Sequence, residues 1–134
     1  MATKLRGGGG SSVLQLDYGD PNVIKSLLKN WSGMEALSLK GDRNATCVLV
    51  DLQEATGIDP NGFDKSNIYK SIGNRNKEVL TVSQFIAIFF VLVLGYSQPE
   101  VEYIFGVSHQ SISNSIKSGS KRISEYLERS MLDG

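Results

Sequence analysis

The sequence predicts an all-α protein, and three observations support this fold class. Apolar residues recur at spacings of three and four in several segments, which is the period of a helix with one buried side. Residues that favour helix N-termini, such as Asp, Ser and Thr, stand immediately before those segments. No segment shows the sustained alternation that is typical of a half-buried strand. A chain of 134 residues, 40% of them hydrophobic, suits one helical domain or a small domain with an ordered extension.

The N-terminal part of the chain is predicted to contain a tail and two helices. Residues 1–12 include a run of consecutive glycines and are expected to form a flexible tail. The Asp20–Pro21 pair begins a helix with one apolar side, which is expected to end near Ser32–Gly33. Asp42 is the N-cap of a second helix, which is expected to run to about Ala55.

A loop, a short helix and an apolar helix are predicted next. Turn-forming residues indicate a loop at 57–62, and a short helix at 65–72 is followed by a polar link at 73–78. Thr81 is expected to cap an apolar helix that ends at Leu94–Gly95. Its apolar run is about half as long as a membrane span requires. We therefore expect this helix to be buried within the protein.

Two short helices joined by a tight turn are predicted between Ser97 and Lys117. Ser97 and Glu100 form an S-x-x-E capping box, which predicts that a helix starts after Ser97. Gly106 stands where the end of a helix needs a left-handed residue, and Ser108 is a second N-cap. This order of helix, glycine, apolar residue, cap and helix is typical of a helix-turn-helix. An ordinary helical hairpin is the alternative.

Apolar residues at helical spacing predict the buried sides of these two helices. Val101, Ile104 and Phe105 are expected to face the core from the first helix. The second helix is expected to continue past Lys117, because a stripe of residues keeps helical spacing beyond it. The members of that stripe are Ile112, Ile116, Gly119, Ile123 and Tyr126.

The motif residues also resemble a known family. Leu80, Thr81 and Gln84 match an "LT-x-x-Q" opening, residues 95–98 match "G-Y-S-Q", and residues 106–108 match "G-[IV]-S". On these residues the C-terminal segment resembles the promoter-reading fourth region of bacterial sigma factors. It is even more similar to the small sigma-like regulators of bacteriophages.

The resemblance extends upstream to Gly41-Asp42, Ala45 and Val50-Asp51-Leu52, which are similar to the "GD … A … VDLE-x-A" helix of the phage proteins. Two departures are Phe105 in place of leucine and Glu102 where the family usually has alanine. The resemblance implies a helical regulator that binds DNA and controls transcription of phage genes in the cytoplasm of a bacterial host. It also implies contact with host RNA polymerase.

In a helix-turn-helix, the first turns of the second helix face the base edges of the major groove. Gln110 and Asn114 lie one turn apart, and either amide is suited to pairing with adenine. The residues expected at or near the groove are Ser108, His109, Gln110, Ser111, Asn114 and Lys117. Phosphate contacts are expected from the backbone N–H groups of Ser97 and Gln98 and from the side chains of Lys121 and Arg122. The alternative for each residue is a solvated polar surface.

The overall charge of the chain argues against DNA binding, but its distribution argues for it. Fourteen basic residues balance fourteen acidic ones, whereas many nucleic-acid-binding domains are clearly basic. No acidic residue lies between Glu102 and Glu125, and that window contains His109, Lys117, Lys121 and Arg122. Few phosphate contacts imply weak binding by one chain alone. We therefore expect help from a second copy or from a protein partner.

Several other classes of function are disfavoured. The only histidine, His109, lies far in sequence from the only cysteine, Cys47, so the chain has no usual set of metal ligands. The glycine run lacks the lysine of a phosphate-binding loop, and the serines have no recognisable catalytic partners. We therefore expect no enzyme, cofactor or metal. The chain also lacks a secretory signal, and its single cysteine fits the reducing cytoplasm.

The sequence thus predicts a tail at 1–12, an N-terminal helical region at 13–79 and a helix-turn-helix DNA-binding domain at 80–134. The expected function is sequence-specific reading of double-stranded DNA by the helix that starts after Ser108. One alternative is a DNA-packaging protein that resembles a small terminase, although the C-terminal position of the motif argues against it. Another is a protein-interaction module that docks onto RNA polymerase without binding DNA by itself.

Overall fold

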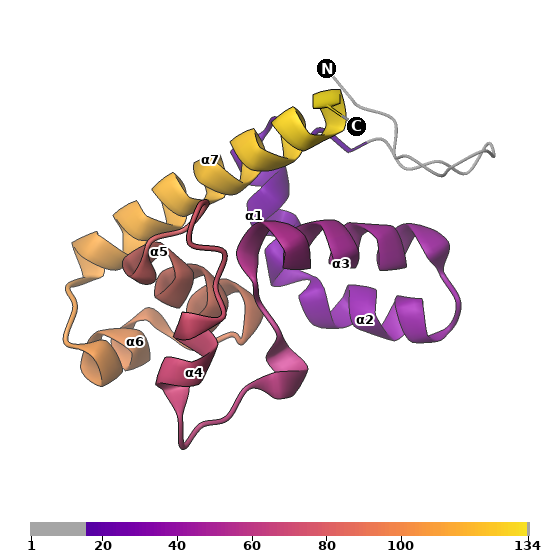
Figure 1. Cartoon of the computed structure of the whole chain (residues 1–134). Helices are drawn as coiled ribbons and strands as arrows, with labels where there is room; N and C mark the ends of the chain where they lie inside the picture. The colour runs from indigo at the N-terminus through magenta and orange to yellow at the C-terminus, as the bar shows by residue number, and fades with distance from the viewer. Residues whose placement is uncertain (1–15, 134) are drawn as a thin grey trace.

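The computed structural model describes residues 16–133, and all regular secondary structure in this part of the chain is helical (Figure 1). The predicted flexible tail at 1–12 lies outside the described residues. The elements are α1 Pro21–Lys29, α2 Trp31–Leu39, α3 Arg43–Thr56, the 3₁₀ turn Pro60–Gly62, α4 Ile68–Gly73, α5 Val82–Ile86, the π-helix Ala87–Val93, α6 Gln98–Phe105 and α7 His109–Asp133. The prediction of an all-α fold is therefore confirmed.

The first predicted helix is in fact two helices. Asp20 caps α1 as expected, and its side chain accepts a hydrogen bond from the Asn22 backbone. The helix ends before Asn30, and α2 begins immediately at Trp31 and continues through the predicted stop at Ser32–Gly33. Trp31 is 1% exposed, so burial of the largest side chain in the chain outweighs the weak helix propensity of serine and glycine.

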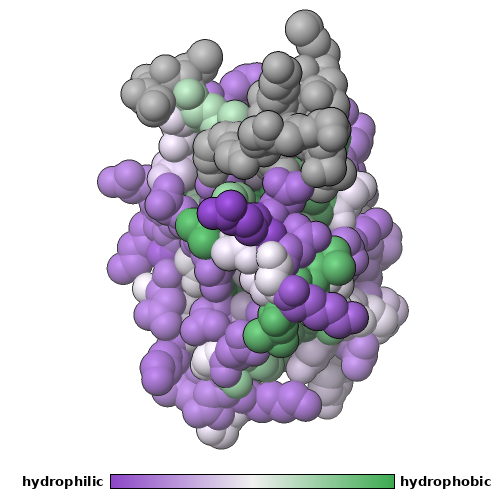
Figure 2. All heavy atoms as spheres, turned by 90° about the vertical axis from the view of Figure 1, so that its right-hand side faces the viewer, coloured by the Kyte–Doolittle hydropathy of each residue, from purple (hydrophilic) through white to green (hydrophobic). Residues whose placement is uncertain are grey.

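The α2–α3 hairpin projects from one side of the molecule (Figure 1). Asp42 caps α3 as predicted, accepting a hydrogen bond from Ala45 N at 3.1 Å. Figure 2 faces this end of the molecule and shows hydrophobic patches among hydrophilic residues. The exposed large apolar side chains on the two helices are Leu37, Leu39 and Val50. The hairpin therefore leaves part of its apolar surface uncovered.

The segment between α3 and α5 is ordered by side-chain hydrogen bonds. The predicted short helix starts at Ile68, three residues later than expected, because Asp64 forms a turn first. The Asp64 carboxylate accepts hydrogen bonds from both the backbone and the hydroxyl of Ser66. Arg75 then donates to the carbonyl oxygens of Ile72 and Leu80, each at 3.1 Å, which fixes the chain just before α5.

The predicted apolar helix forms, but most of it is a π-helix. Thr81 and Gln84 cap its start with a reciprocal box. From Ala87 onward the backbone widens, and consecutive side chains turn into the core, which helical periodicity does not predict. Phe90 lies among the rings of four other residues, with centroid distances of 5.1 to 5.5 Å to Phe63, Phe89, Tyr96 and Phe105. This aromatic cluster attaches α6 to the rest of the protein.

The last helix, α7, is one continuous element that contacts both the N-terminal and the C-terminal helices. It packs against α1, α3, α5 and α6. Gly119 lies against the π-helix, since a Cβ atom there would clash with Cδ1 of Ile88. Farther along, the buried Ser124 hydroxyl donates to the Tyr18 carbonyl. The two regions that were predicted from the sequence therefore share one core.

Candidate nucleic-acid interface

The turn between α6 and α7 has the local geometry that its sequence predicts. Ser97 and Glu100 satisfy each other's backbone N–H groups, at 2.8 and 3.2 Å. Gly106 ends α6 in the left-handed conformation, with φ of 65°. Ser108 then caps α7, and its hydroxyl accepts a hydrogen bond from Ser111 N at 3.0 Å. Local capping therefore fixes where each of the two helices begins and ends.

The buried side of α6 is narrower than the sequence predicts. Val101 is fully buried and Phe105 is half-buried against Phe90, as expected. Ile104, which was predicted to face the core, is 44% exposed. The reason is angular: Phe105 and Ile104 lie on opposite sides of Val101 around the helix, and the π-helix covers only the side of Phe105. The prediction for Ile104 was wrong.

Four of the predicted contact residues form one exposed row on α7. Gln110, Asn114, Lys117 and Lys121 are spaced four, three and four residues apart, so they lie on one side of the helix. All four are exposed. We call this row the polar stripe. Ile112 and Ile123, which are buried, hold α7 from another side, so the polar stripe is presented by a helix that the core fixes in place.

Two other predicted residues, Ser108 and His109, lie exposed at the start of α7. His109 Nδ1 is 3.6 Å from Glu102 Oε2, and this contact becomes an ion pair when the imidazole is protonated. Glu102 stands where the family that the sequence resembles usually has alanine. Its carboxylate places a negative charge beside the first turn of α7.

Ser111 lies apart from the polar stripe. It is half-buried and lines a cavity of about 30 Å³ between α7 and α5, together with Val107 and Ile112. A cavity of this size has room for about one water molecule. The structure therefore directs Ser111 toward α5 rather than into the row that Gln110 and Asn114 share.

At the start of α6, an internal hydrogen bond uses one of the two predicted phosphate donors. The Ser97 N–H donates to Glu100 Oε1, and Pro99 has no N–H group. Within residues 97–101 this leaves the Gln98 N–H as the unused backbone donor. The backbone N–H of Ser97, followed by its side chain, holds the pKa of the Glu100 carboxyl below its ordinary value. The carboxylate therefore stays charged at this helix end.

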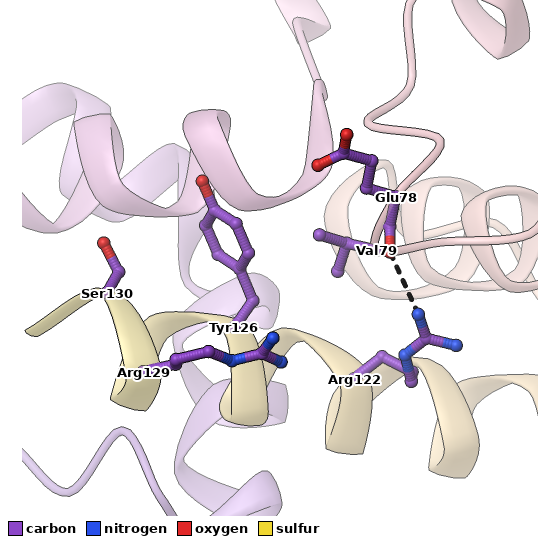
Figure 3. Close-up of a pocket in the computed structure, with 6 residues that line it drawn as sticks. All are labelled: Glu78, Val79, Arg122, Tyr126, Arg129 and Ser130. Atoms are coloured by element: carbon purple, nitrogen blue, oxygen red, sulfur yellow. Dashed lines mark hydrogen bonds between the residues drawn. The ribbon is translucent and has the colours of Figure 1, made fainter. Parts of the chain in front are cut away.

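The two predicted phosphate-binding side chains on the second half of α7 have different surroundings. Lys121 belongs to the polar stripe and is exposed. Arg122 lies on another side of α7, and its guanidinium donates to the Glu78 carbonyl at 2.9 Å (Figure 3). Near it lies Arg129, which sequence reasoning missed. The signal was present, because a spacing of seven residues places two side chains on the same side of a helix.

Within residues 16–133, no group of three or more His, Cys, Asp and Glu side chains is arranged to hold a metal ion. No helix in this part of the chain has the length and apolar character that a bilayer span requires. Comparisons with models of protein families, with curated proteins and with solved structures found no match.

Proposed function

We propose that this protein is a sequence-specific DNA-binding regulator of transcription that resembles the fourth region of sigma factors. Its recognition element is the first half of α7, which enters the major groove with the polar stripe facing the bases. The observation that carries the proposal is the polar stripe itself: two amides and two lysines in one exposed row, behind a capped turn. Gln110 and Asn114 read bases, and Lys117 and Lys121 contact bases or phosphates.

The distribution of charge supports this role and limits its strength. From residue 103 to residue 124 the chain has no acidic side chain, so the polar stripe lies in a locally positive environment. The whole chain is neutral, however, and the stripe offers only two lysines. Such an interface binds DNA weakly and with a shallow salt dependence. A second copy of the chain or RNA polymerase supplies the remaining affinity.

The test is selection of duplexes from a random pool at low salt, with the parent chain, Gln110→Ala and Asn114→Ala compared. A sequence motif that the parent chain enriches, and that each of the two variants enriches less selectively, would establish base reading by α7. Gln53→Ala is the matched control, because Gln53 is an exposed glutamine on a different helix. Equal weak binding by all four proteins without enrichment would contradict the proposal.

A second candidate is a module that docks onto RNA polymerase without binding DNA by itself. It is favoured by the exposure of two large side chains on α6, Tyr103 at 91% and Ile104 at 44%. Aromatic residues are enriched in protein interfaces. Binding of the protein to purified bacterial RNA polymerase separates the two candidates. The docking module would be favoured if Tyr103→Ala abolished polymerase binding while Gln110→Ala and added duplex left it unchanged.

A further inference from the structure

A pocket lies between the segment that precedes α5 and the second half of α7, away from the polar stripe (Figure 3). Its volume is about 320 Å³, which is at the lower end of the range for small-molecule sites. It is lined by Glu78, Val79, Arg122, Tyr126, Arg129 and Ser130. The proposed function uses none of these residues. Arg122, which was predicted from the sequence to contact phosphate, lies on a different side of α7 from Lys117 and Lys121.

The positively charged groups of the pocket are two guanidinium groups on one side of α7. Arg122 is held in place by its hydrogen bond to the Glu78 carbonyl at 2.9 Å, which leaves its other N–H groups available. The Arg129 guanidinium makes no hydrogen bond or ion pair within residues 16–133. In Figure 3 the Arg129 side chain extends along α7 toward Arg122, while the Glu78 carboxylate points away from both.

The remaining lining gives the pocket an apolar wall and two hydroxyl groups. Tyr126 lies between the two arginines on α7, and its half-buried ring faces the side where Val79 is buried. The tyrosine and Ser130 hydroxyls are able to donate hydrogen bonds. The pocket therefore combines two positive charges, hydroxyl donors and an apolar surface large enough for part of an organic ring.

We propose that this pocket binds a phosphate monoester, with the phosphate on Arg122 and Arg129 and the organic part against Val79 and Tyr126. A guanidinium group donates two parallel hydrogen bonds to a pair of phosphate oxygens, and two guanidinium groups balance the nearly two negative charges of a phosphate monoester. The phosphate belongs either to a free small molecule or to the terminal phosphate of a nucleic-acid strand, which is also a monoester. The chemistry is shared by both sources, and it does not depend on base reading by the polar stripe.

The experiment follows the arginine Nε–Hε signals of the labelled full chain by NMR while phenyl phosphate or inorganic phosphate is added at constant ionic strength. We expect saturable shifts for Arg122 and Arg129, with tighter binding of phenyl phosphate because its ring contacts Tyr126. Arg129→Gln should weaken binding by about tenfold or more, since it removes one charge-assisted contact. Arg43→Gln, an exposed arginine at the start of α3, is the matched control and should bind as the parent does.

Shifts that rise linearly without saturation, and that are the same in Arg129→Gln and Arg43→Gln, would overturn the proposal. A second series adds a short duplex with 5′-phosphate ends before phenyl phosphate. Continued saturable binding identifies a free small molecule as the source, whereas loss of binding together with duplex-induced shifts of both arginines identifies nucleic acid. A negative result for phosphate binding does not change the outcome of the duplex selection with Gln110→Ala, so the two proposals are tested independently.

Discussion

Tyr18 and Asp51 are joined by a buried hydrogen bond across 33 residues of sequence, with the Tyr18 hydroxyl donating to Asp51 Oδ2 at 3.0 Å. The backbone carbonyl of the same tyrosine accepts a hydrogen bond from the Ser124 hydroxyl. Tyr18, which precedes α1 in the chain, thus connects α3 to α7. Through this residue the N-terminal helices contribute to the position of the helix that carries the polar stripe.

Tyr18→Phe should lower the free energy of unfolding by roughly 1 to 3 kcal/mol, because it removes a buried donor to a carboxylate while keeping the ring. Denaturant unfolding followed by circular dichroism measures the change. Tyr69→Phe removes the hydroxyl of a tyrosine that is 83% exposed, so it should leave stability unchanged. Equal midpoints for Tyr18→Phe and Tyr69→Phe would show that the buried bond contributes nothing.

Gly119→Ala should destabilise the protein by about 1 to 3 kcal/mol, because the added methyl group overpacks the contact with Ile88. In an Ile88→Val background, which lacks the Cδ1 atom, the same substitution should destabilise the protein less, since only the close contact with Gln84 Cβ remains and alanine favours a helix more than glycine. Gly73→Ala is the control, because a Cβ atom at Gly73 meets no atom within 4 Å. Additive effects in the double variant would rule out this contact as the cause.

The lowered pKa of the Glu100 carboxyl predicts how the stability of the protein depends on pH. Hydrogen bonds from Ser97 lower its pKa in the folded state, so its contribution to stability is present above the unfolded pKa. That contribution is lost as the pH falls through the folded pKa. Glu100→Gln keeps an acceptor for the capping box but does not titrate, so it should be less stable than the parent at neutral pH.

The difference in the free energy of unfolding between the parent and Glu100→Gln should disappear in acid. Denaturant unfolding curves recorded from about pH 7 to about pH 3 measure this change. Glu125→Gln is the control, because the Glu125 carboxylate makes no hydrogen bond within the described residues. A constant difference between parent and Glu100→Gln at every pH would mean that charge at the helix start has no role.

If the polar stripe binds DNA, Lys117→Ala and Lys121→Ala should each weaken binding to a short duplex. A lysine that neutralises one phosphate contributes about 0.9 to the slope of log affinity against log salt. Each substitution should therefore reduce the slope by about that amount in an anisotropy titration over several salt concentrations. Lys29→Ala, an exposed lysine on α1, should leave the slope unchanged. A slope that falls equally for Lys29→Ala would indicate nonspecific attraction by the whole surface.

The features that the sequence predicted correctly are local ones. The N-caps Asp20, Asp42, Thr81, Ser97 and Ser108 all form, because a cap needs only the residues within one turn of it. Gly106 is left-handed for the same reason. The starts of five helices could therefore be predicted without knowledge of the fold.

The features that were missed depend on residues far apart in the chain. The separate helix α2 exists because Trp31 finds a buried site, and in the π-helix Phe89 and Phe90 pack against three other phenylalanine rings from Phe63, Phe85 and Phe105. Ile104 is exposed because the neighbouring elements leave its side of α6 uncovered. The pocket at Arg122 and Arg129 also needs the segment before α5, which sequence spacing alone does not place beside α7.

The uninterrupted course of α7 has a consequence for protein engineering. The rotation of Gln110 about the helix axis is set by the buried anchor Ile112 beside it and by Ile123 and Leu127, which lie several turns downstream. Deleting a single residue near 118 would rotate the first three residues of the polar stripe by about 100° relative to the downstream anchors and draw them back by about 1.5 Å, so Ile112 could no longer be buried on the same side as Ile123. Insertions or deletions at that point are therefore expected to lower stability, even though they leave every residue of the polar stripe in the chain.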